Sequence, residues 1–258
     1  MHYKKISIIT VTWNRAKLLE EAIKNVIDQN YPNYEHIIID NASNDGTIDI
    51  LKKYPNLKWI SEPDRGQSEA MNKGLKIATG DIFAWMNDDD LYPEGTFDLI
   101  NKEFDLAKYS FIYGTCNIIG SYGQKIGQSN FHKFNRNALM MGYNNVNTPA
   151  VFASLSLIKR LGFMDESLYA TFDLDMWIRL SKIKKPYPLK KVTSNLRLHD
   201  GSGLMSAKVH LKEKALIRKK YLSEVPLYFR ILFEPYYKIK QFLYDNVKMR
   251  IYGFNMNK

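Results

Sequence analysis

The stretch "ISIITVTWNRAKLLEEAIKNVIDQNYPNYEHIIID" (residues 6–40) decides the fold class. Its β-branched apolar run at 6–13 indicates a buried strand. Apolar residues at 18, 19, 22, 23, 26 and 27 then follow helical spacing, and "YPNY" ends that helix. The run "EHIIID" (35–40) indicates a second strand. A strand, a helix and a strand with short connections predict a parallel βαβ unit.

The same alternation continues to residue 86. The turn "NASNDGT" precedes a helix that runs through Tyr54, with Thr47 as its expected N-cap. Strands are expected over 57–62 and 81–86, separated by the helix "SEAMNKGLKIAT". Repeated right-handed units of this kind give a mostly parallel sheet with helices on both faces. We therefore predict an α/β fold whose ligands bind beyond the carboxyl ends of the strands.

The second half of the chain is less regular. A strand is expected over 109–120, and the polar, Asn- and Gly-rich segment 123–149 is predicted to be loop with a short helix. "PAVFASLSLIKRLG" predicts a strand followed by a helix, and "DESLYATFDLDMWIRLSKI" predicts a helix. The predicted organisation is one α/β domain, 1–205, in two halves, 1–95 and 96–205, followed by a basic helical extension, 206–258.

Composition indicates which kinds of partner and which cellular compartment to expect. The chain has 258 residues and a formal net charge of +10, with a pI of about 9.4, which favours acidic partners such as nucleotides or anionic lipid. The single cysteine, Cys116, allows no intrachain disulfide and lies in an apolar run that indicates an inert core position. The apolar part of "MHYKKISIITVTWNR" is too short for a signal peptide. We expect a cytoplasmic protein.

Three consecutive carboxylates, Asp88, Asp89 and Asp90, follow the strand in "GDIFAWMNDDDLYPEG" (80–95). Mg²⁺ and Mn²⁺ prefer oxygen ligands, and one or two carboxylates plus substrate phosphates suffice for Mg²⁺. The alternative is an acidic turn screened by water. Because "TWNR", "DNASNDG" and "NDDD" all follow strands of one sheet, the sequence favours a cation site at its carboxyl edge.

Asp40, at the end of the second strand, can accept hydrogen bonds from a ribose or a base. The alternative is an Asx-turn that organises the loop. The first turn, "TVTWNRAKL", contains no GxGxxG, which disfavours a dinucleotide site.

Three ordered blocks resemble family 2 glycosyltransferases of the GT-A fold: 6–47 (from "ISIITVTWNR" to "NASNDGT"), "SEPDRGQSEAMNKGLKIATGDIFAWMNDDDLYPEG" and "GFMDESLYATFDLDMWIRL". The resemblance covers about residues 5–205 and implies that 1–205 is a catalytic domain, with a nucleotide-sugar half, 1–95, and an acceptor half, 96–205. It implies a Rossmann-like nucleotide-diphospho-sugar transferase fold and inverting transfer from a nucleotide-sugar, with UDP-sugar as the leading donor. It also implies a Mn²⁺ or Mg²⁺ cofactor and a saccharide or lipid-linked saccharide acceptor.

The resemblance also implies roles for individual residues. Asn87 stands where many relatives carry the first acid of the metal motif, so the register of the ligands among the three acids stays open. The implied roles are Thr10, Asn14 and Arg15 in the nucleotide pocket, Asp40 at the base, Arg65, Lys73 and Asp88 near the donor, Asp89, Asp90 and His199 at the metal or diphosphate, and Asp173 as general base.

The chemistry of transfer requires such a division of roles. A sugar hydroxyl is a poor nucleophile at neutral pH, so a positioned carboxylate must take its proton. The departing diphosphate needs electrostatic stabilisation, which a metal supplies. Asp173 and Asp175 could instead be first-turn acids favoured by the helix dipole. Arg179 is expected to pair with Asp175 on the helix surface.

Tryptophans 13, 85 and 177 are interpreted as packing residues. The tail is basic, with six Lys or Arg against one Glu over 205–221, and aromatic residues follow. Two interpretations stay open for it: attachment to an anionic membrane surface, or a helix pair packed on the catalytic domain. Nucleic acid is not expected.

Three rival functions would require other sequence features. A nucleotidyltransferase would need a glycine-rich phosphate loop, which "TWNRAKL" does not offer. A calcium-binding carbohydrate module would spread its acids over a loop. The alternative from another class is a non-enzymatic basic protein that binds a membrane surface or nucleic acid.

Overall fold

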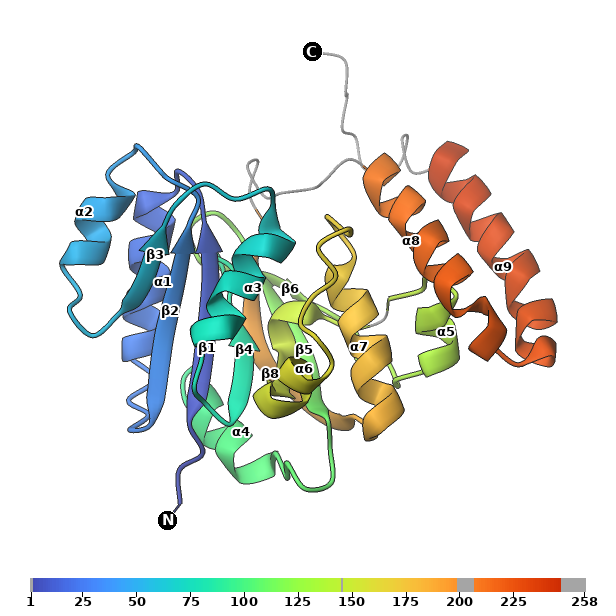
Figure 1. The fold of residues 1–258 in the computed structure, drawn as a ribbon, viewed down its shortest axis with the longest axis horizontal. Coiled ribbons are helices and arrows are strands. Elements are labelled where there is room, and N and C mark those ends of the chain that lie inside the picture. Colours follow the sequence, from blue (N-terminus) through green and yellow to red (C-terminus); the bar gives the residue numbers. More distant parts are fainter. Residues whose placement is uncertain (1, 145, 199–206, 247–258) are drawn as a thin grey trace.

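A computed structural model describes residues 2–144, 146–198 and 207–246 of the chain. These residues form one eight-stranded sheet with helices on both faces (Figure 1). The strands are β1 (Ile6–Thr12), β2 (Tyr34–Asp40), β3 (Lys58–Ser61), β4 (Ile82–Trp85), β5 (Phe111–Ile119), β6 (Lys125–Gln128), β7 (Val151–Ser154) and β8 (Tyr187–Arg197). Their order is β3-β2-β1-β4-β7-β5-β6, and β8 pairs with β5.

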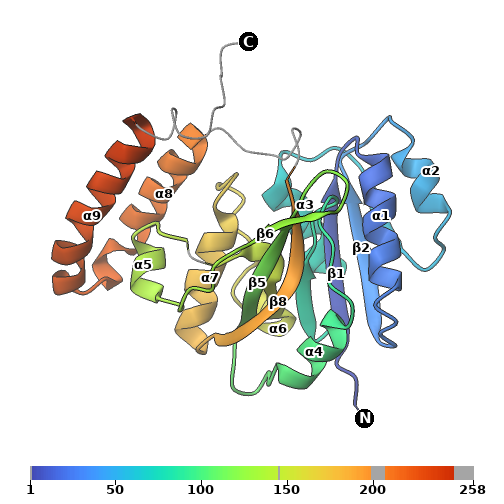
Figure 2. The ribbon, with the colours of Figure 1, turned by 180° about the vertical axis from the view of Figure 1, so that it is seen from behind.

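Helices cover both faces and one end of this sheet. In chain order they are α1 (Ala16–Ile27), α2 (Thr47–Lys52), α3 (Gln67–Ile77), α4 (Thr96–Glu103), α5 (Arg136–Met140), α6 (Leu155–Arg160), α7 (Phe172–Ile183), α8 (Ala207–Tyr221) and α9 (Leu227–Asn246), with the short 3-10 helices η1 (Thr148–Ala150) and η2 (Leu222–Glu224). The first face carries α3, α6 and α7 (Figure 1), and the second carries α1 and α4 (Figure 2).

The first four strands form the parallel part of the sheet. β1 pairs with β2 and β4, and β2 pairs with β3, all in parallel. Residues of β1 and β2 such as Ile8, Ile9 and Ile38 are fully buried, because helices cover both faces and continuous β-branched runs suit such strands. The predicted α/β fold with a mostly parallel sheet is confirmed.

One local prediction in this half is wrong. Thr47 is the first residue of α2 rather than its N-cap, and Gly46 takes the cap position at φ 94°. Asp45 explains the shift, since its Oδ1 accepts hydrogen bonds from both Thr47 N and Thr47 Oγ1. Helix α2 therefore begins one residue earlier than predicted, and its cap position needs the left-handed backbone conformation that glycine adopts readily.

The second half adds antiparallel pairing. β7 runs antiparallel to β4 and β5, while β8 runs parallel to β5 over its length. The strands β5 and β7 and the helices α6 and α7 agree with the sequence predictions. The loop prediction for 123–149 is wrong at β6, which is an edge strand with mostly exposed residues. Its polar sequence, with Gly127, carries no apolar alternation to reveal it.

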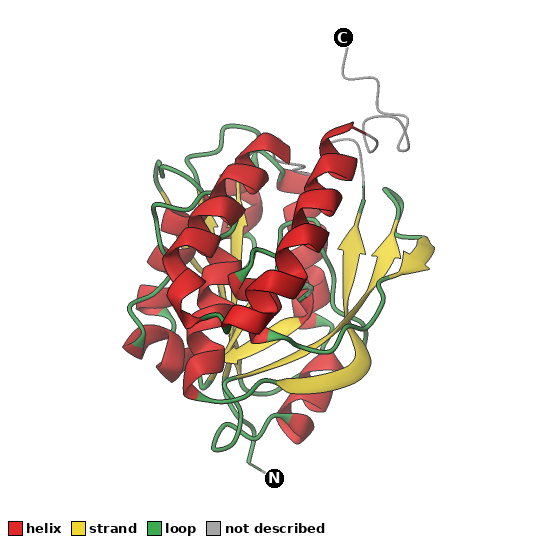
Figure 3. Ribbon diagram, turned by 90° about the vertical axis from the view of Figure 1, so that its right-hand side faces the viewer, coloured by secondary structure: helices red, strands yellow, loops and turns green. Residues whose placement is uncertain are grey.

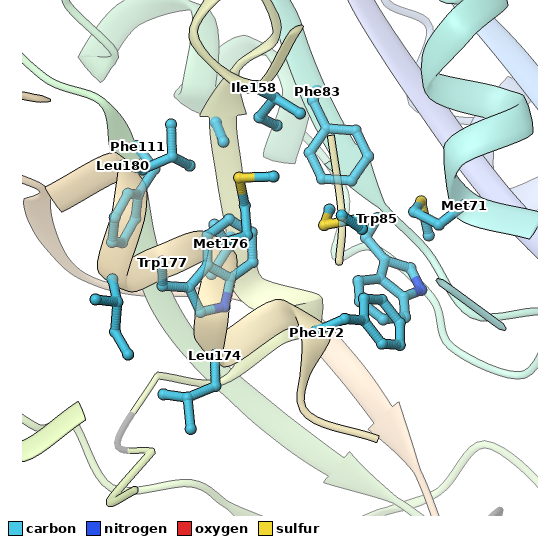
Figure 4. Close-up of a cluster of buried hydrophobic side chains, with 14 of the residues drawn as sticks. Met71, Phe83, Trp85, Phe111, Ile158, Phe172, Leu174, Met176, Trp177 and Leu180 are labelled. Carbon is cyan, nitrogen blue, oxygen red and sulfur yellow. The ribbon is translucent and has the colours of Figure 1, made fainter. Parts of the chain in front are cut away.

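The largest core cluster lies between the sheet and helices α3, α6 and α7 (Figure 4). Trp177 is fully buried in it, and Trp85 stacks on Phe172 with ring centroids 5.2 Å apart and an interplanar angle of 19°. The packing interpretation of these two tryptophans is confirmed. Cys116 is also buried, and burial raises the pKa of its thiol to about 12, as expected of an inert core position.

The C-terminal helices α8 and α9 lie side by side at one end of the sheet, next to α7 and α5 (Figures 1 and 3). Ile217, Tyr221 and Val225 are buried in the main core, and Phe229 and Phe233 of α9 pack against it. The predicted helical extension is therefore present and docked. Its predicted start at residue 206 lies outside the described residues. Among the described helices, none is both long and apolar enough to cross a bilayer.

Candidate functional site

A cleft of about 670 Å³ opens at the carboxyl ends of β1 and β4. One wall carries Arg15, Asp88 and Asp89, from the loops that follow these two strands. A second wall comes from helices and carries Asp173, in the first turn of α7, and His210 of α8. The structure thus brings four of the predicted site residues, from three separate sequence blocks, to one cleft.

The acidic loop has a counter-charge that its neighbouring sequence lacks. Arg15, 74 residues earlier in the chain, places its Nη1 2.8 Å from Asp89 Oδ2 and 3.4 Å from Asp88 Oδ1. Thr12 Oγ1 also donates to Asp88 Oδ2 at 2.7 Å. Burial and the charge of Asp89 raise the pKa of Asp88 to about 6, although the bonds from Thr12 and Arg15 oppose the shift.

Asp90 is buried and does not line the cleft, a position that does not favour its prediction as a metal ligand. Its Oδ1 accepts from Arg197 N at 2.9 Å and its Oδ2 accepts from Asn87 Nδ2 at 2.7 Å. Burial, and then the charge of Asp89, raise the pKa of Asp90 to about 7. The chain turns here, with Asp90 N donating to Asn87 O, and this turn sends successive side chains in different directions.

Arg197, at the end of β8, also lines the cleft and holds the acidic loop. Its Nε donates to Asp89 O at 2.8 Å and its Nη2 donates to Glu21 Oε1 at 2.7 Å. Leu91 forms a bridge to Asn195 of the same strand. The long strand β8 therefore fixes the backbone of the acidic loop.

The remaining pair, Asp88 and Asp89, fits a divalent cation of the Mg²⁺ or Mn²⁺ type. The residues that the structure describes include no cluster of three or more His, Cys, Asp or Glu able to hold a metal. Such ions need only one or two carboxylates when substrate phosphates complete the shell. His199, the third predicted metal residue, lies outside the described residues.

Three residues predicted for the nucleotide pocket do not line the cleft. Thr10 is fully buried within β1 and bonds to His36 of β2; Thr12, one pleat repeat further along, takes the position at the strand end. Asn14 is exposed and ties two loops together through Ser43 Oγ and Asn44 N.

Asp40 is the third of these residues, and the Asx-turn alternative describes it better. Its carboxylate is fully buried and accepts hydrogen bonds from Ser43 N, Ser43 Oγ and Ser61 Oγ. These bonds anchor the loop after β2 to β3.

Two basic residues predicted near the donor also lie outside the cleft lining. Arg65 is exposed and donates to Glu69 at 2.7 Å and Glu166 at 2.9 Å. Lys73 Nζ bonds to Pro63 O at 2.9 Å and to Glu62 at 2.8 Å. Both organise the segment between β3 and α3, whose Asp64 and Gly66 do line the cleft.

Two hydrogen bonds hold the carboxylate of Asp173 on the second wall of the cleft. Thr148 Oγ1 donates to its Oδ2, and Leu174 N donates to its Oδ1 at 2.7 Å. Burial raises the pKa of Asp173, while these bonds and the positive field of Lys214 oppose the rise. A partly buried carboxylate with a raised pKa can take a proton from a hydroxyl in the same cleft.

Asp175, two residues on, has a structural role. Arg179 Nε donates to its Oδ2 at 2.7 Å, which confirms the predicted pair. The expected surface position is wrong, because Asp175 is fully buried and also bonds to Lys220 and Tyr221 of α8.

Sequence reasoning missed several cleft residues. Trp13 was interpreted as packing, but it is 61% exposed and lines the cleft. Tyr169 and His210 also line it, and no motif marks them. An aromatic residue directly after a strand that ends in polar residues was the available signal for Trp13.

A sheet of this topology, with a carboxylate pair after β4 and a separate carboxylate across the same cleft, defines the class of GT-A glycosyltransferases. The family model described as "Glycosyl transferase family 2" matches residues 7–164, which is more than half of the chain. The chain therefore belongs to glycosyl transferase family 2, and the resemblance seen in its sequence is confirmed.

Individual relatives are distant. RT0329, an uncharacterized glycosyltransferase of Rickettsia typhi, is 25% identical over 231 residues, which cover 85% of this chain and 72% of that protein. For three other rickettsial relatives the chain spans only 34% to 39% of their length.

Solved structures share the fold. S. aureus TarS 1–349 in complex with UDP-GlcNAc gives a TM-score of 0.64 at 19% identity, covering 84% of this chain and 71% of TarS 1–349. The mannosyltransferase PcManGT of Pyrobaculum calidifontis, in complex with GDP-Man and Mn²⁺, gives 0.66 at 18%, covering 91% and 69%.

Proposed function

We propose that this chain transfers a sugar from a nucleotide-sugar to a hydroxyl of a saccharide or lipid-linked saccharide, with inversion at the anomeric carbon. One observation carries the proposal: the carboxylate pair Asp88 and Asp89, after β4, and the separate carboxylate Asp173, at the start of α7, line one cleft. Inverting transfer needs a base on the side of the sugar that faces away from the leaving nucleotide.

Asp173 is the proposed base. It accepts the proton of the attacking hydroxyl as the new glycosidic bond forms and the bond to the diphosphate breaks. Thr148 and the backbone of Leu174 hold the carboxylate in place. The raised pKa of Asp173 makes it a better proton acceptor than an exposed aspartate would be.

Asp88 and Asp89 are the residues proposed to hold Mn²⁺ or Mg²⁺ with the donor diphosphate. The ion would offset the negative charge that develops on the leaving group. Arg15 contacts both carboxylates and keeps them together. TarS binds UDP-GlcNAc, and PcManGT binds GDP-Man and Mn²⁺; these two donors and the metal support a nucleotide-sugar and a divalent ion here, with UDP-sugar leading.

Exposed aromatic residues support a saccharide acceptor. Trp13 and Tyr169 are 61% and 48% exposed and both line the cleft. Aromatic rings with one free face can pack against the apolar face of a sugar ring. Their position in the cleft that also contains Asp173 suits the acceptor or the transferred sugar.

The test is a thermal-shift screen of UDP-GlcNAc, UDP-glucose, UDP-galactose and GDP-mannose, each with Mn²⁺, Mg²⁺ or EDTA. We expect one donor to raise the melting temperature only when a divalent ion is present, followed by slow hydrolysis of that donor. If no donor stabilises the protein with either ion, the enzyme proposal fails and the alternative, a non-enzymatic basic protein, is favoured.

We also propose that α9 rests on an anionic lipid surface, at the inner face of the cytoplasmic membrane. Leu227, Tyr228, Ile231 and Leu232 are each more than 60% exposed, and their spacing of four places them on one face of the helix. The net charge of +10 complements anionic lipid. This position would present the cleft to a lipid-linked acceptor.

Vesicle sedimentation tests this surface. The full chain should bind phosphatidylglycerol vesicles at low salt and phosphatidylcholine vesicles weakly, and the double variant Ile231→Glu, Leu232→Glu should not bind. Equal sedimentation of the variant and the unchanged chain would refute this membrane contact.

A further inference from the structure

The wall of the cleft that carries Asp173 and His210 is named the acceptor wall, after the proposed role of Asp173. Helix α8 contacts this wall through one buried carboxylate. Glu213 Oε1 accepts a hydrogen bond from Tyr169 N at 2.7 Å. Its Oε2 accepts from Ala170 N at 2.8 Å, Thr171 N at 2.9 Å and Thr171 Oγ1 at 3.0 Å. Four donors from three consecutive residues thus converge on a side chain 42 to 44 residues away in sequence.

These donors lie directly before α7, which carries Asp173. Thr171 is the N-cap residue of α7, but its side chain makes no capping bond to the helix. The backbone N–H groups at the start of a helix need acceptors from elsewhere, and a carboxylate there is also favoured by the helix dipole. Glu213 supplies an acceptor and a negative charge to the segment that leads into the helix.

A second set of bonds aligns α8 with α7. Lys220 Nζ and Tyr221 Oη both donate to Asp175 Oδ1 at 2.7 Å, two turns along α8 from Glu213. His210, three residues before Glu213, lines the cleft itself. Helix α8 is therefore joined to α7 at two points, and its first half faces the site.

We infer that Glu213 is a positioning residue for glycosyl transfer: it fixes segment 169–171 and thereby the place of Asp173 in the cleft. The inference rests on the proposed function, in which Asp173 is the base. It assigns α8 of the C-terminal extension to the acceptor site. A small displacement of a base from its hydroxyl is enough to lower turnover strongly.

Glu224 provides a matched control. It is a second carboxylate of the extension that bonds to the rest of the protein, through Arg136 at 2.9 Å and Lys182 at 3.1 Å. It touches neither segment 169–171 nor Asp173 in any described contact. Glu224→Gln therefore loosens the docking of the extension without changing the acceptor wall.

The first test needs no substrate. Hydrogen exchange of peptides covering 165–175 is compared in the full chain, Glu213→Gln and Glu224→Gln. We expect exchange of the amides of Tyr169, Ala170 and Thr171 to accelerate about tenfold in Glu213→Gln only. Unchanged protection in Glu213→Gln, or equal loss in both variants, would overturn the inference.

The second test follows hydrolysis of the panel donor that gives the largest thermal shift, with Mn²⁺. Glu213→Gln should lower kcat about tenfold, with the dissociation constant for UDP and Mn²⁺ within about twofold. Glu224→Gln should leave both unchanged. A Glu213→Gln enzyme with loss of UDP binding but unchanged kcat would contradict a positioning role on the acceptor wall.

A double-mutant comparison separates this inference from the proposed function. In the Asp173→Asn background, Glu213→Gln should add no further loss of kcat, because the group it positions is already gone. An equal loss in both backgrounds would show that Glu213 does not act through Asp173. An Asp173→Asn enzyme with full turnover would instead refute Asp173 as the base, whatever Glu213→Gln does.

Discussion

The two walls of the cleft are built differently. The donor wall is the carboxyl edge of a parallel sheet, and its acids Asp88 and Asp89 are held by Thr12, the last residue of the neighbouring strand β1, and by Arg15 in the loop that follows it. The acceptor wall is a helix start, and its Asp173 depends on segments that the sheet does not order. Strand pairing therefore brings the segments of the donor wall together, whereas side-chain bonds from α8 hold the segment that leads into the acceptor wall.

The walls meet at one aromatic contact. Trp85, the last residue of β4, stacks on Phe172, the first residue of α7 (Figure 4). Asp88 follows the first of these rings by three residues, and Asp173 follows the second directly. The spacing between the two sets of acids is thus set partly by this contact.

The largest expected effect comes from the acceptor wall. Asp173→Asn keeps the shape of the side chain but removes the proton acceptor, so donor hydrolysis should fall by about 10²- to 10⁴-fold. Binding of UDP with Mn²⁺, measured by titration calorimetry, should stay within about twofold. A variant with normal turnover would show that the base lies elsewhere.

Next in size is the corresponding change on the donor wall. Asp89→Asn removes one carboxylate of the pair and the closer partner of Arg15. The affinity for UDP in the presence of Mn²⁺ should fall by about 10- to 100-fold, and affinity measured in EDTA should change little. Asp98→Asn, on the exposed side of α4, is the control and should bind normally. Equal loss with and without metal would argue against a metal role.

The difference between the walls also explains what the sequence could predict. The first half of the chain has periodic apolar runs, and acids directly follow β4. Both are local patterns, so the sequence alone predicts the parallel sheet and the position of Asp88 and Asp89. The position of Asp90 could not be predicted, because a turn of the backbone directs its carboxylate to the backbone N–H of Arg197. Thr10 and Thr12 share one face of β1, and only the length of the strand decides which of them reaches the edge.

The acceptor wall was readable only in part. The resemblance located Asp173, yet nothing near residue 169 shows that Glu213 and His210 complete its surroundings. Such contacts join segments more than 35 residues apart and leave no periodic trace. The folded structure was required to see them.

A smaller effect is expected where the walls meet. Phe172→Leu removes the ring stacked on Trp85 and should lower the free energy of unfolding by about 1 kcal/mol beyond the loss of volume. Phe104→Leu, a fully buried ring in the other core cluster, measures the cost of volume alone. Urea unfolding of both variants gives the comparison. If Phe172→Leu costs no more than Phe104→Leu, the stack contributes nothing specific.

The smallest effect concerns the acid that joins neither wall. Because burial raises the pKa of Asp90 to about 7, from 3.8 in the unfolded chain, the folded state binds more protons between these values. This contribution to stability is complete below about pH 4 and is lost as the pH rises through about 7. Asp90→Asn stays neutral and keeps an acceptor for Arg197 N, so it should not lose stability in this way.

Differential scanning fluorimetry in EDTA tests this expectation. The melting temperature of Asp90→Asn, relative to the unchanged chain, should be higher by a few degrees at pH 8 than at pH 5. Asp98→Asn should show no such trend, because its carboxylate is exposed. Parallel pH curves for Asp90→Asn and the unchanged chain would mean that Asp90 is ionised at little cost. The acidic loop would then carry three negative charges rather than two. The single positive charge of Arg15 would balance a smaller share of them.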